Sequence, residues 1–263
     1  MTELLMTERQ QRERRFYEEY SRRTGPTEIS FVPILGKEKR PWNPYWFVCE
    51  LVMRHFNSTD QKLLDFGCGS GCYSLLFARI GYEVFGFDIS SNSISEAKRV
   101  AEKYALEDRT HFAVNVAEQP AYPSEYFDVV VGIDILHHVE ILPSIKECFR
   151  LLKQGGIAIF KEPIEVPIFD PLRDTGFGKW LVPKTASYER HVTEDEKKLT
   201  ANDLHAIREL FPDLSIRWFR LLSRLAVFFR KGLPVLEMVD DRALKVFPFL
   251  KRFGGEIVLI LKK

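Results

Sequence analysis

Short, almost continuously apolar segments alternate with amphipathic segments between residues 62 and 161. Five segments have the length and composition of buried strands: residues 62–65, 83–88, 110–115, 127–133 and 156–161. Between them, helical patterns cover residues 72–80, 93–103 and 141–152. Strands without a polar face that alternate with helices predict a mostly parallel sheet with helices on both sides. The expected fold class is therefore a doubly wound α/β fold.

The rhythm changes after residue 162. Residues 163–200 and 221–252 predict two insertions, the second of them helical and strongly apolar. The regular elements predicted around them are a helix at residues 201–210, capped by Thr200, and strands at residues 214–219 and 256–261. These two strands and the first five predict a seven-stranded sheet.

The N-terminal part has a different character. Residues 8–23 predict a charged helix with Phe16, Tyr17 and Tyr20 on one side, and residues 46–56 predict an amphipathic helix. We therefore expect residues 1–61 to form a helical extension or lid, and residues 62–263 to form the main domain. The helix at residues 93–103 is expected to begin with a capping box made by Ser93 and Glu96.

Composition narrows the class of protein. The chain has 263 residues, with 38 Lys and Arg against 37 Asp and Glu, so no overall basic footprint for nucleic acid exists. No apolar run reaches the length of a spanning helix, and the charged N-terminus does not resemble a secretory signal. The four cysteines form no CxxC pair and no zinc-type cluster. We expect a cytoplasmic protein with reduced thiols and no metal site.

A glycine-rich turn follows the first strand. Gly67, Gly69 and Gly71 alternate with other residues, and a helix comes directly after them. Such a turn lets the backbone approach a ligand, and the free N–H groups of the helix attract a nucleotide-like molecule. The dinucleotide fingerprint would need glycine at position 72, which is Cys72. Asp65, two residues before the turn, favours a cationic ligand group over a pyrophosphate.

Asp88 ends the second strand, about 20 residues after the glycine turn. A carboxylate at this place accepts hydrogen bonds from both hydroxyls of a ribose. The alternative is that Asp88 only caps the helix that follows it. The paired spacing favours the ribose interpretation.

The chain resembles the class I S-adenosylmethionine-dependent methyltransferases, closely over residues 62–161 and more loosely beyond. The stretches that carry the resemblance are LLDFGCGSG at 63–71, VFGFD at 84–88, FDVV at 127–130, LHHV at 136–139 and LLKQGG at 151–156. The resemblance implies a Rossmann-like sheet with an antiparallel last strand, which residues 256–261 match in position. It also implies S-adenosylmethionine as the cofactor.

Residue by residue, the resemblance implies the following cofactor site. Asp65 and the turn of Gly67, Cys68, Gly69 and Gly71 would hold the methionine part. Asp88 would bind the ribose, and Ile89 would pack on the adenine. The adenine would also meet the stretch of Asn115, Val116, Ala117 and Glu118, where Val116 replaces the usual acid and Asn115 or the backbone near Ala117 takes over its contact. Asp134 and Ile135 would line the methyl-transfer edge.

Three residues at the carboxyl ends of strands are candidate catalytic bases. His137 and His138 follow the fourth strand, and Glu162 follows the fifth. Open α/β sheets bind ligands at this edge, and histidine titrates near neutral pH. The alternative is that the two histidines only shape the pocket. His191, in the first insertion, is a further candidate.

The acceptor is less defined than the cofactor. We expect a small molecule, with an apolar, aromatic or lipid-linked hydroxyl compound as the main hypothesis. Carbon methylation of a quinone-like ring and a non-catalytic, cofactor-binding regulatory protein are the alternatives. Nucleic acid is not expected, because the place of a D/N-P-P-Y turn is taken by residues 134–137, and the similar stretch at residues 43–46 precedes the cofactor motif.

Residues 214–236 contain no acid but five basic residues among many apolar ones. This composition suits peripheral contact with a membrane surface. A core-packed helix with solvated arginines and a subunit contact are the alternatives.

Overall fold

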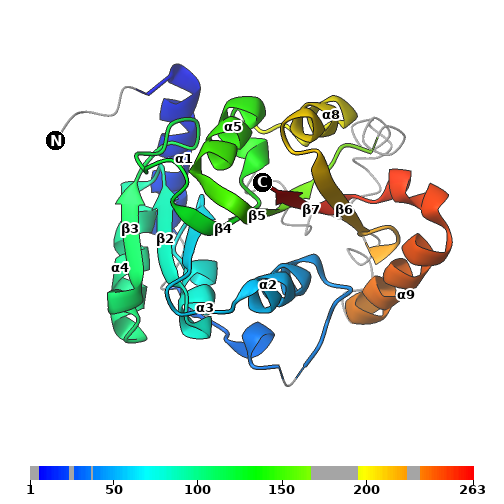
Figure 1. Ribbon diagram of the computed structural model, residues 1–263, viewed down its shortest axis with the longest axis horizontal. Helices are drawn as coiled ribbons and strands as arrows, with labels where there is room; N and C mark the ends of the chain where they lie inside the picture. Colours follow the sequence, from blue (N-terminus) through cyan, green and yellow to red (C-terminus); the bar gives the residue numbers. More distant parts are fainter. Residues whose placement is uncertain (1–5, 24–26, 37, 167–194, 224–231) are drawn as a thin grey trace.

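A single seven-stranded sheet organises the chain. The computed structural model describes residues 6–23, 27–36, 38–166, 195–223 and 232–263. The strands lie in the order β3-β2-β1-β4-β5-β7-β6 (Figure 1). Their bounds are β1 Lys62–Phe66, β2 Glu83–Asp88, β3 Thr110–Val114, β4 Phe127–Ile133, β5 Leu152–Pro163, β6 Asp213–Phe219 and β7 Glu256–Lys262.

Strands β1 to β5 are parallel, and β7 runs antiparallel to both of its neighbours, β5 and β6. The predicted doubly wound sheet with an antiparallel last strand is confirmed. The order changes direction at β1, whose neighbours are β2 on one side and β4 on the other. In an open α/β sheet this switch point is where a ligand is expected, outside the carboxyl ends of the strands.

Helices cover both faces of the sheet (Figure 1). The α-helices are α1 Glu8–Arg23, α2 Pro44–His55, α3 Cys72–Ile80, α4 Ser91–Lys103, α5 Ile141–Leu151, α8 Ala201–Leu210 and α9 Leu233–Val246. Short 3₁₀ helices are η1 Val32–Ile34, η2 Glu107–Arg109, η3 Leu136–His138 and η7 Pro248–Phe253. One core lies between the sheet and α2, α3 and α4, and a second core lies between the sheet and α5 and α8.

The two cores follow from the alternation of side chains along each strand. In β1, Leu63 belongs to the first core, whereas Leu64 and Phe66 belong to the second. The Phe66 ring packs edge-on between two other aromatic rings, with its centroid 4.8 Å from that of Phe87 and 5.9 Å from that of Phe160. Because this cluster is fully enclosed behind the switch point, it fixes the strands that carry the site.

Several boundaries differ from the sequence prediction. Helix α4 begins at Ser91, and its N-cap is Ser90, whose hydroxyl accepts from the Ser93 N–H. The predicted capping box at Ser93 and Glu96 is therefore wrong. In contrast, the capping box at Thr200 is present, with Asp203 as its second member.

The structure describes only part of the N-terminal extension and of the two insertions. Helix α2 buries Phe47, Val48 and Val52 in the first core, so this helix shares the core of the main domain. Most of the first insertion, residues 167–194 with His191, lies outside the described residues, as do residues 224–231 of the second. The described part of the second insertion is helical. Among the described residues, no helix is both long and apolar enough to cross a bilayer.

Replacing Phe66 by Ala should destabilise the fold strongly, because the ring is fully buried and its neighbours cannot close the cavity. We expect a loss of about 3–5 kcal/mol in the free energy of unfolding, measured by urea denaturation. Phe249→Ala is the matched control, since its side chain is 62% exposed, and it should change stability by less than about 0.5 kcal/mol. Equal losses in the two variants would contradict this description of the core.

Candidate active site

A cavity of about 260 Å³ lies at the switch point, between the carboxyl ends of β1, β2 and β4 and helix α1. Ten residues predicted as site residues line it: Gly67, Gly69, Asp88, Ile89, Asn115, Ala117, Glu118, Asp134, Ile135 and His138. The sequence motifs, which are spread over more than 70 positions, therefore meet at one edge of the sheet. This is the expected place for a nucleotide-like ligand.

The glycine turn approaches the cavity closely. A Cβ atom on Gly69 would meet nothing within 4 Å, so this backbone faces open space. A Cβ atom on Gly67 would lie 2.5 Å from the Ile135 side chain, so the turn packs directly on the segment after β4. Both residues have positive φ, +51° and +75°, which L side chains rarely adopt. The turn is thus shaped to admit a ligand on one side and to touch β4 on the other.

Asp88 connects this turn to the next strand. Its Oδ2 accepts from the Gly69 N–H at 3.0 Å, and its Oδ1 accepts from the Ser90 N–H at 2.9 Å. Burial raises the pKa of this carboxyl, and the two backbone hydrogen bonds oppose that rise. Each oxygen of a carboxylate has room for a second hydrogen bond. Asp88 therefore holds the turn and still offers acceptors to the cavity.

Four predicted cofactor residues stand behind the cavity wall in the part of the chain that is described. Asp65 is buried and accepts from the Ser74 hydroxyl at 2.6 Å, which ties β1 to the first turn of α3. Burial raises the pKa of Asp65 to about 7, and the hydrogen bonds from Ser74 oppose this. Cys68, Gly71 and Val116 also pack away from the cavity.

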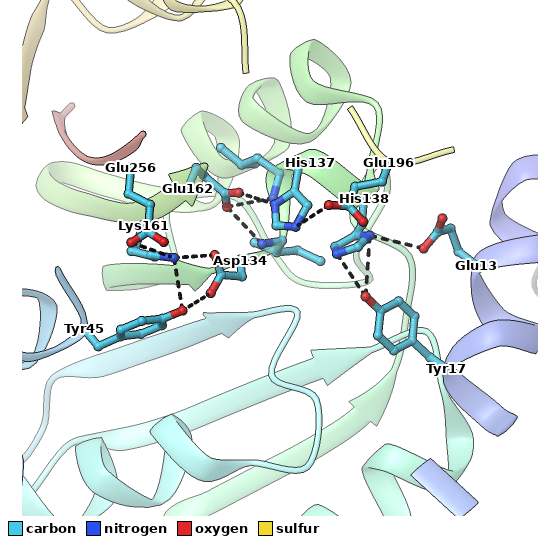
Figure 2. A network of polar contacts seen from close by, with 12 residues as sticks. Glu13, Tyr17, Tyr45, Asp134, His137, His138, Lys161, Glu162, Glu196 and Glu256 are labelled. Atoms are coloured by element: carbon cyan, nitrogen blue, oxygen red, sulfur yellow. Dashed lines mark hydrogen bonds and ion pairs between the residues drawn. The ribbon is translucent and has the colours of Figure 1, made fainter. Parts of the chain in front are cut away.

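His137 and Glu162, two of the predicted catalytic residues, form a buried pair (Figure 2). The distance from His137 Nδ1 to Glu162 Oε2 is 2.7 Å. The other carboxylate oxygen of Glu162 accepts from the N–H groups of Ile135 and Leu136, at 2.9 and 2.8 Å. As a carboxylate, Glu162 only accepts, so this hydrogen bond places the proton of neutral His137 on Nδ1 and leaves the lone pair on Nε2.

The surroundings of His137 favour its protonated form. Burial lowers its pKa, but the hydrogen bond and the charge of Glu162, with smaller contributions from Asp134 and Glu196, raise the pKa above its ordinary value. The Nε2 atom lies 3.8 Å from Glu196 Oε1. An acid that orients an imidazole is an arrangement that general-base catalysis uses. His137 and Glu162 are buried beside the cavity and are not among the residues that line it, whereas His138 is.

His138 faces the cavity and contacts helix α1. Its Nε2 lies 2.9 Å from the Tyr17 hydroxyl, and its Nδ1 lies 3.5 Å from Glu13 Oε2 (Figure 2). The His138 ring also packs edge-on against the Tyr17 ring. The two histidines therefore differ: one is oriented by β5, and the other joins the sheet edge to α1.

Helix α1 closes the cavity with polar contacts. Its lining residues are Arg9, Gln10, Glu13, Tyr17, Tyr20 and Ser21. The Glu18 carboxylate accepts from the Ser91 N–H at 2.8 Å and from the Ser91 hydroxyl at 2.7 Å, at the N-terminus of α4. At the other end, Gln10 donates to Glu118 at 2.7 Å. No residue of α1 belongs to either apolar core, so we expect this helix to be a segment of low local stability.

A second polar cluster was not predicted. Asp134 has a left-handed backbone, φ +56°, and its carboxylate accepts from Lys161 Nζ at 2.7 Å and from the Tyr45 hydroxyl at 2.8 Å (Figure 2). Burial lowers the pKa of Lys161, but the charges of Glu256 and Asp134 outweigh burial and raise the pKa above its ordinary value. This lysine is therefore charged. A lysine followed by a glutamate in an otherwise apolar buried strand was the sequence signal for this cluster.

Within the described ranges, two groups of side chains have ligand atoms close enough together to hold a metal ion. They are Asp134, His137 and Glu162, and His137, His138 and Glu196, each with ligand atoms within 4.8 Å of one another. The sequence predicted no metal site, because these residues are far apart in the chain. That expectation remains a prediction.

Residues 64–160 match a family described as a methyltransferase domain. This stretch is similar to methyltransferase domains, and solved structures of S-adenosylmethionine-dependent methyltransferases share its fold. The resemblance inferred from the sequence motifs is thereby confirmed.

Curated relatives and solved structures agree with this family. A ubiquinone biosynthesis O-methyltransferase of Cereibacter sphaeroides is 34% identical over 139 residues, which are 51% of this chain and 56% of the relative. One of Rhodopseudomonas palustris is 28% identical over 181 residues, 66% of each chain. The chain thus spans about half the length of the first of these relatives.

Two solved structures share the fold over most of the chain. The geranyl diphosphate C-methyltransferase of Streptomyces coelicolor has a TM-score of 0.62 at 14% identity, and the match covers 97% of this chain and 98% of that one. The phosphoethanolamine N-methyltransferase 2 of Haemonchus contortus has a TM-score of 0.58 at 18% identity, covering 94% and 60%. At such identities the likeness shows the fold alone.

Removing the Glu18 carboxylate should loosen α1 from the rim of the cavity. We expect Glu18→Ala to speed amide hydrogen exchange in α1 by about tenfold, because a charge-assisted hydrogen bond contributes about 1.5–3 kcal/mol. Glu19→Ala is the matched control, since Glu19 pairs only with Arg23 on the helix surface in the described structure. Equal exchange in the two variants would show that Glu18 does not dock the helix.

Proposed function

We propose that this chain transfers a methyl group from S-adenosylmethionine to a hydroxyl oxygen of a small, apolar acceptor, with His137 as the base. The observation that carries the proposal is the Glu162–His137 pair, next to a cavity lined by the glycine turn and Asp88. The similarity to methyltransferase domains supports the cofactor, and the site geometry supports the assignment of roles.

The residues of the cavity fit the cofactor. Asp88 has unused acceptor capacity for two ribose hydroxyls, and Gly69 leaves open space beside the turn. Ile89 and the stretch from Asn115 to Glu118 lie where an adenine ring would follow the ribose. When bound, the cofactor supplies a methyl group that its sulfonium has already activated. We propose that Asp65 acts indirectly, by fixing α3 through Ser74.

The tasks of the protein's own residues are to position the acceptor and to remove one proton from it. Glu162 fixes the ring of His137 and keeps Nε2 unprotonated in the neutral form. In that form Nε2 would accept the proton of the acceptor hydroxyl. The hydroxyl oxygen would take the methyl group as the methyl–sulfur bond breaks, and S-adenosylhomocysteine would leave. Because both oxygens of Glu162 are engaged by Ile135, Leu136 and His137, we assign Glu162 to positioning.

The proposal of an oxygen acceptor rests on the relatives. Those of Cereibacter sphaeroides and Rhodopseudomonas palustris are named as O-methyltransferases of ubiquinone biosynthesis. We therefore propose a phenolic hydroxyl on a ring with an apolar substituent. The alternative functions are carbon methylation of such a ring and a non-catalytic role. The experiment is designed to distinguish them from oxygen methylation.

The test measures methyl transfer from methyl-labelled S-adenosylmethionine, with cell extract and with catechols of increasing alkyl chain length as acceptors. Label should enter the organic-soluble fraction, and NMR should place the methyl on oxygen. His137→Gln should lower kcat by about 10²- to 10⁴-fold while cofactor affinity stays unchanged. His205→Gln is the matched control, because the His205 side chain is 79% exposed on α8; it should retain full activity.

Other outcomes would overturn parts of the proposal. Label confined to protein or nucleic acid would exclude a small-molecule acceptor, and a methyl on carbon would exclude oxygen. Full activity of His137→Gln would remove His137 as the base.

The pH dependence of kcat should report the Glu162–His137 pair. Since His137 must be neutral to act and its pKa is raised, kcat should rise with pH to a midpoint above 6.5, the ordinary value for histidine. Glu162→Gln removes the charge that raises the pKa and leaves burial, which lowers it. Compared with the parent chain, we expect Glu162→Gln to have a lower maximal kcat and a midpoint at lower pH. An unshifted midpoint would mean that another group controls the rate.

A further inference from the structure

Helix α9 is built with its polar face toward the protein. Its buried residues include Glu237 and Asp240, whereas Val235, Val239 and Val246 are 59, 45 and 67% exposed. Asp240 accepts from three backbone N–H groups, those of residues 221–223, at 2.7–2.9 Å. A surface helix normally shows the opposite arrangement. The internal partners of its acids explain the buried face. The outer face carries the three valines together with the exposed Arg242 and Lys245.

The exposed apolar side chains continue past the end of α9. Phe247, the C-cap, is 50% exposed, and Phe249 is 62% exposed. Their ring centroids lie 6.0 Å apart in an edge-on arrangement, on either side of Pro248. Two phenylalanines at this exposure form a protruding apolar tip at the turn from α9 into η7 (orange to red in Figure 1). Contiguous apolar surface of this kind marks an interaction site.

The charged side chains that flank the two phenylalanines in the sequence are positive. Between Asp241 and Glu256 the chain carries Arg242, Lys245, Lys251 and Arg252, and no acid. All four are exposed, whereas the acids at either end are engaged: Asp241 pairs with Arg217 and Lys245, and Glu256 pairs with Lys161 and Arg220. Because the whole chain has a net charge of only +1, this patch is a local excess of positive charge.

We propose that this surface, residues 235–252 of α9 and η7, docks on a lipid bilayer that contains anionic headgroups. Phenylalanines that enter the acyl boundary, with lysines and arginines at headgroup level, are the chemistry of interfacial binding. Self-association suits the surface less well. A two-fold dimer would place the same patch on itself and bring Arg242, Lys251 and Arg252 of one copy against the same cations of the other.

The proposed surface lies mostly after residues 214–236, the segment that the sequence singled out. Residues 224–231 of that segment, with Arg224, Arg230 and Lys231, lie outside the described residues. Arg217 lies in β6, with its guanidinium 4.0 Å from the centre of the Phe47 ring and bonded to Asp241, so it serves the interior. Arg220 pairs with Glu256. The described membrane-facing residues therefore come later in the chain, around Phe249. The docking proposal does not depend on the proposed reaction.

The test is co-sedimentation of the full chain with vesicles of phosphatidylcholine containing one quarter phosphatidylglycerol, compared with pure phosphatidylcholine. Binding should be at least about tenfold tighter with the anionic lipid and should weaken as salt rises. Phe247→Ala with Phe249→Ala should lower binding by at least about tenfold, and so should Lys251→Glu with Arg252→Glu.

Matched controls carry the same changes elsewhere. Leu35→Ala with Val32→Ala removes exposed apolar side chains on η1, and Lys98→Glu with Lys103→Glu reverses exposed charges on α4. Both controls should bind like the parent chain. Absence of vesicle binding, equal loss in variants and controls, or a concentration-dependent dimer that the double phenylalanine variant abolishes would each overturn the proposal.

Discussion

The buried carboxylate of Glu162 organises the site edge. It accepts from two successive backbone N–H groups after β4 and from His137, so one side chain of β5 fixes the conformation of η3. An unpaired charge at a fully buried position would be very costly, and here each hydrogen bond offsets part of that cost. Because Ile135 also packs on Gly67, the same carboxylate indirectly sets the position of the glycine turn. The proposed base and the glycine turn are therefore held by one interaction.

The two sides of the cavity are held by different forces. The sheet side rests on two extensive apolar cores, whereas α1 rests on contacts such as Glu18 with Ser91 and Tyr17 with His138. Apolar burial is the larger stabilising contribution in a fold, so the sheet side is rigid and α1 opens at lower cost. The sheet side can position a ligand, and the polar contacts of α1 can open to let it enter. This combination suits a site whose cofactor is exchanged after every turnover. On this account the polarity of α1 is a functional property.

Local motifs carried most of what the sequence could predict. The approximate positions of strands and helices followed from periodicity, although bounds such as the start of α4 differ. Asp88, Gly69 and the Asn115–Glu118 stretch were found because each lies at the end of a recognisable strand. The Tyr45–Asp134–Lys161 cluster was missed because its members are up to 116 positions apart, and only folding brings them together. Asp65 was predicted to hold the methionine part of the cofactor. Its carboxylate accepts from Ser74, nine positions later, and its contact with a ligand remains a prediction. The N-cap of α4 was misplaced because three serines offer similar local chemistry, and the tertiary contact with Glu18 fixes Ser91 as the first helical residue.

The central claim is that the cavity beneath α1 holds the cofactor with its reactive end toward His137. A crystal structure of the chain with S-adenosylhomocysteine tests it most directly. The account predicts ribose hydroxyls within hydrogen-bond distance of the Asp88 carboxylate, and a sulfur atom that faces His137 Nε2 across a space open to an acceptor. A ribose away from Asp88, or a sulfur separated from His137 by packed protein, would contradict it.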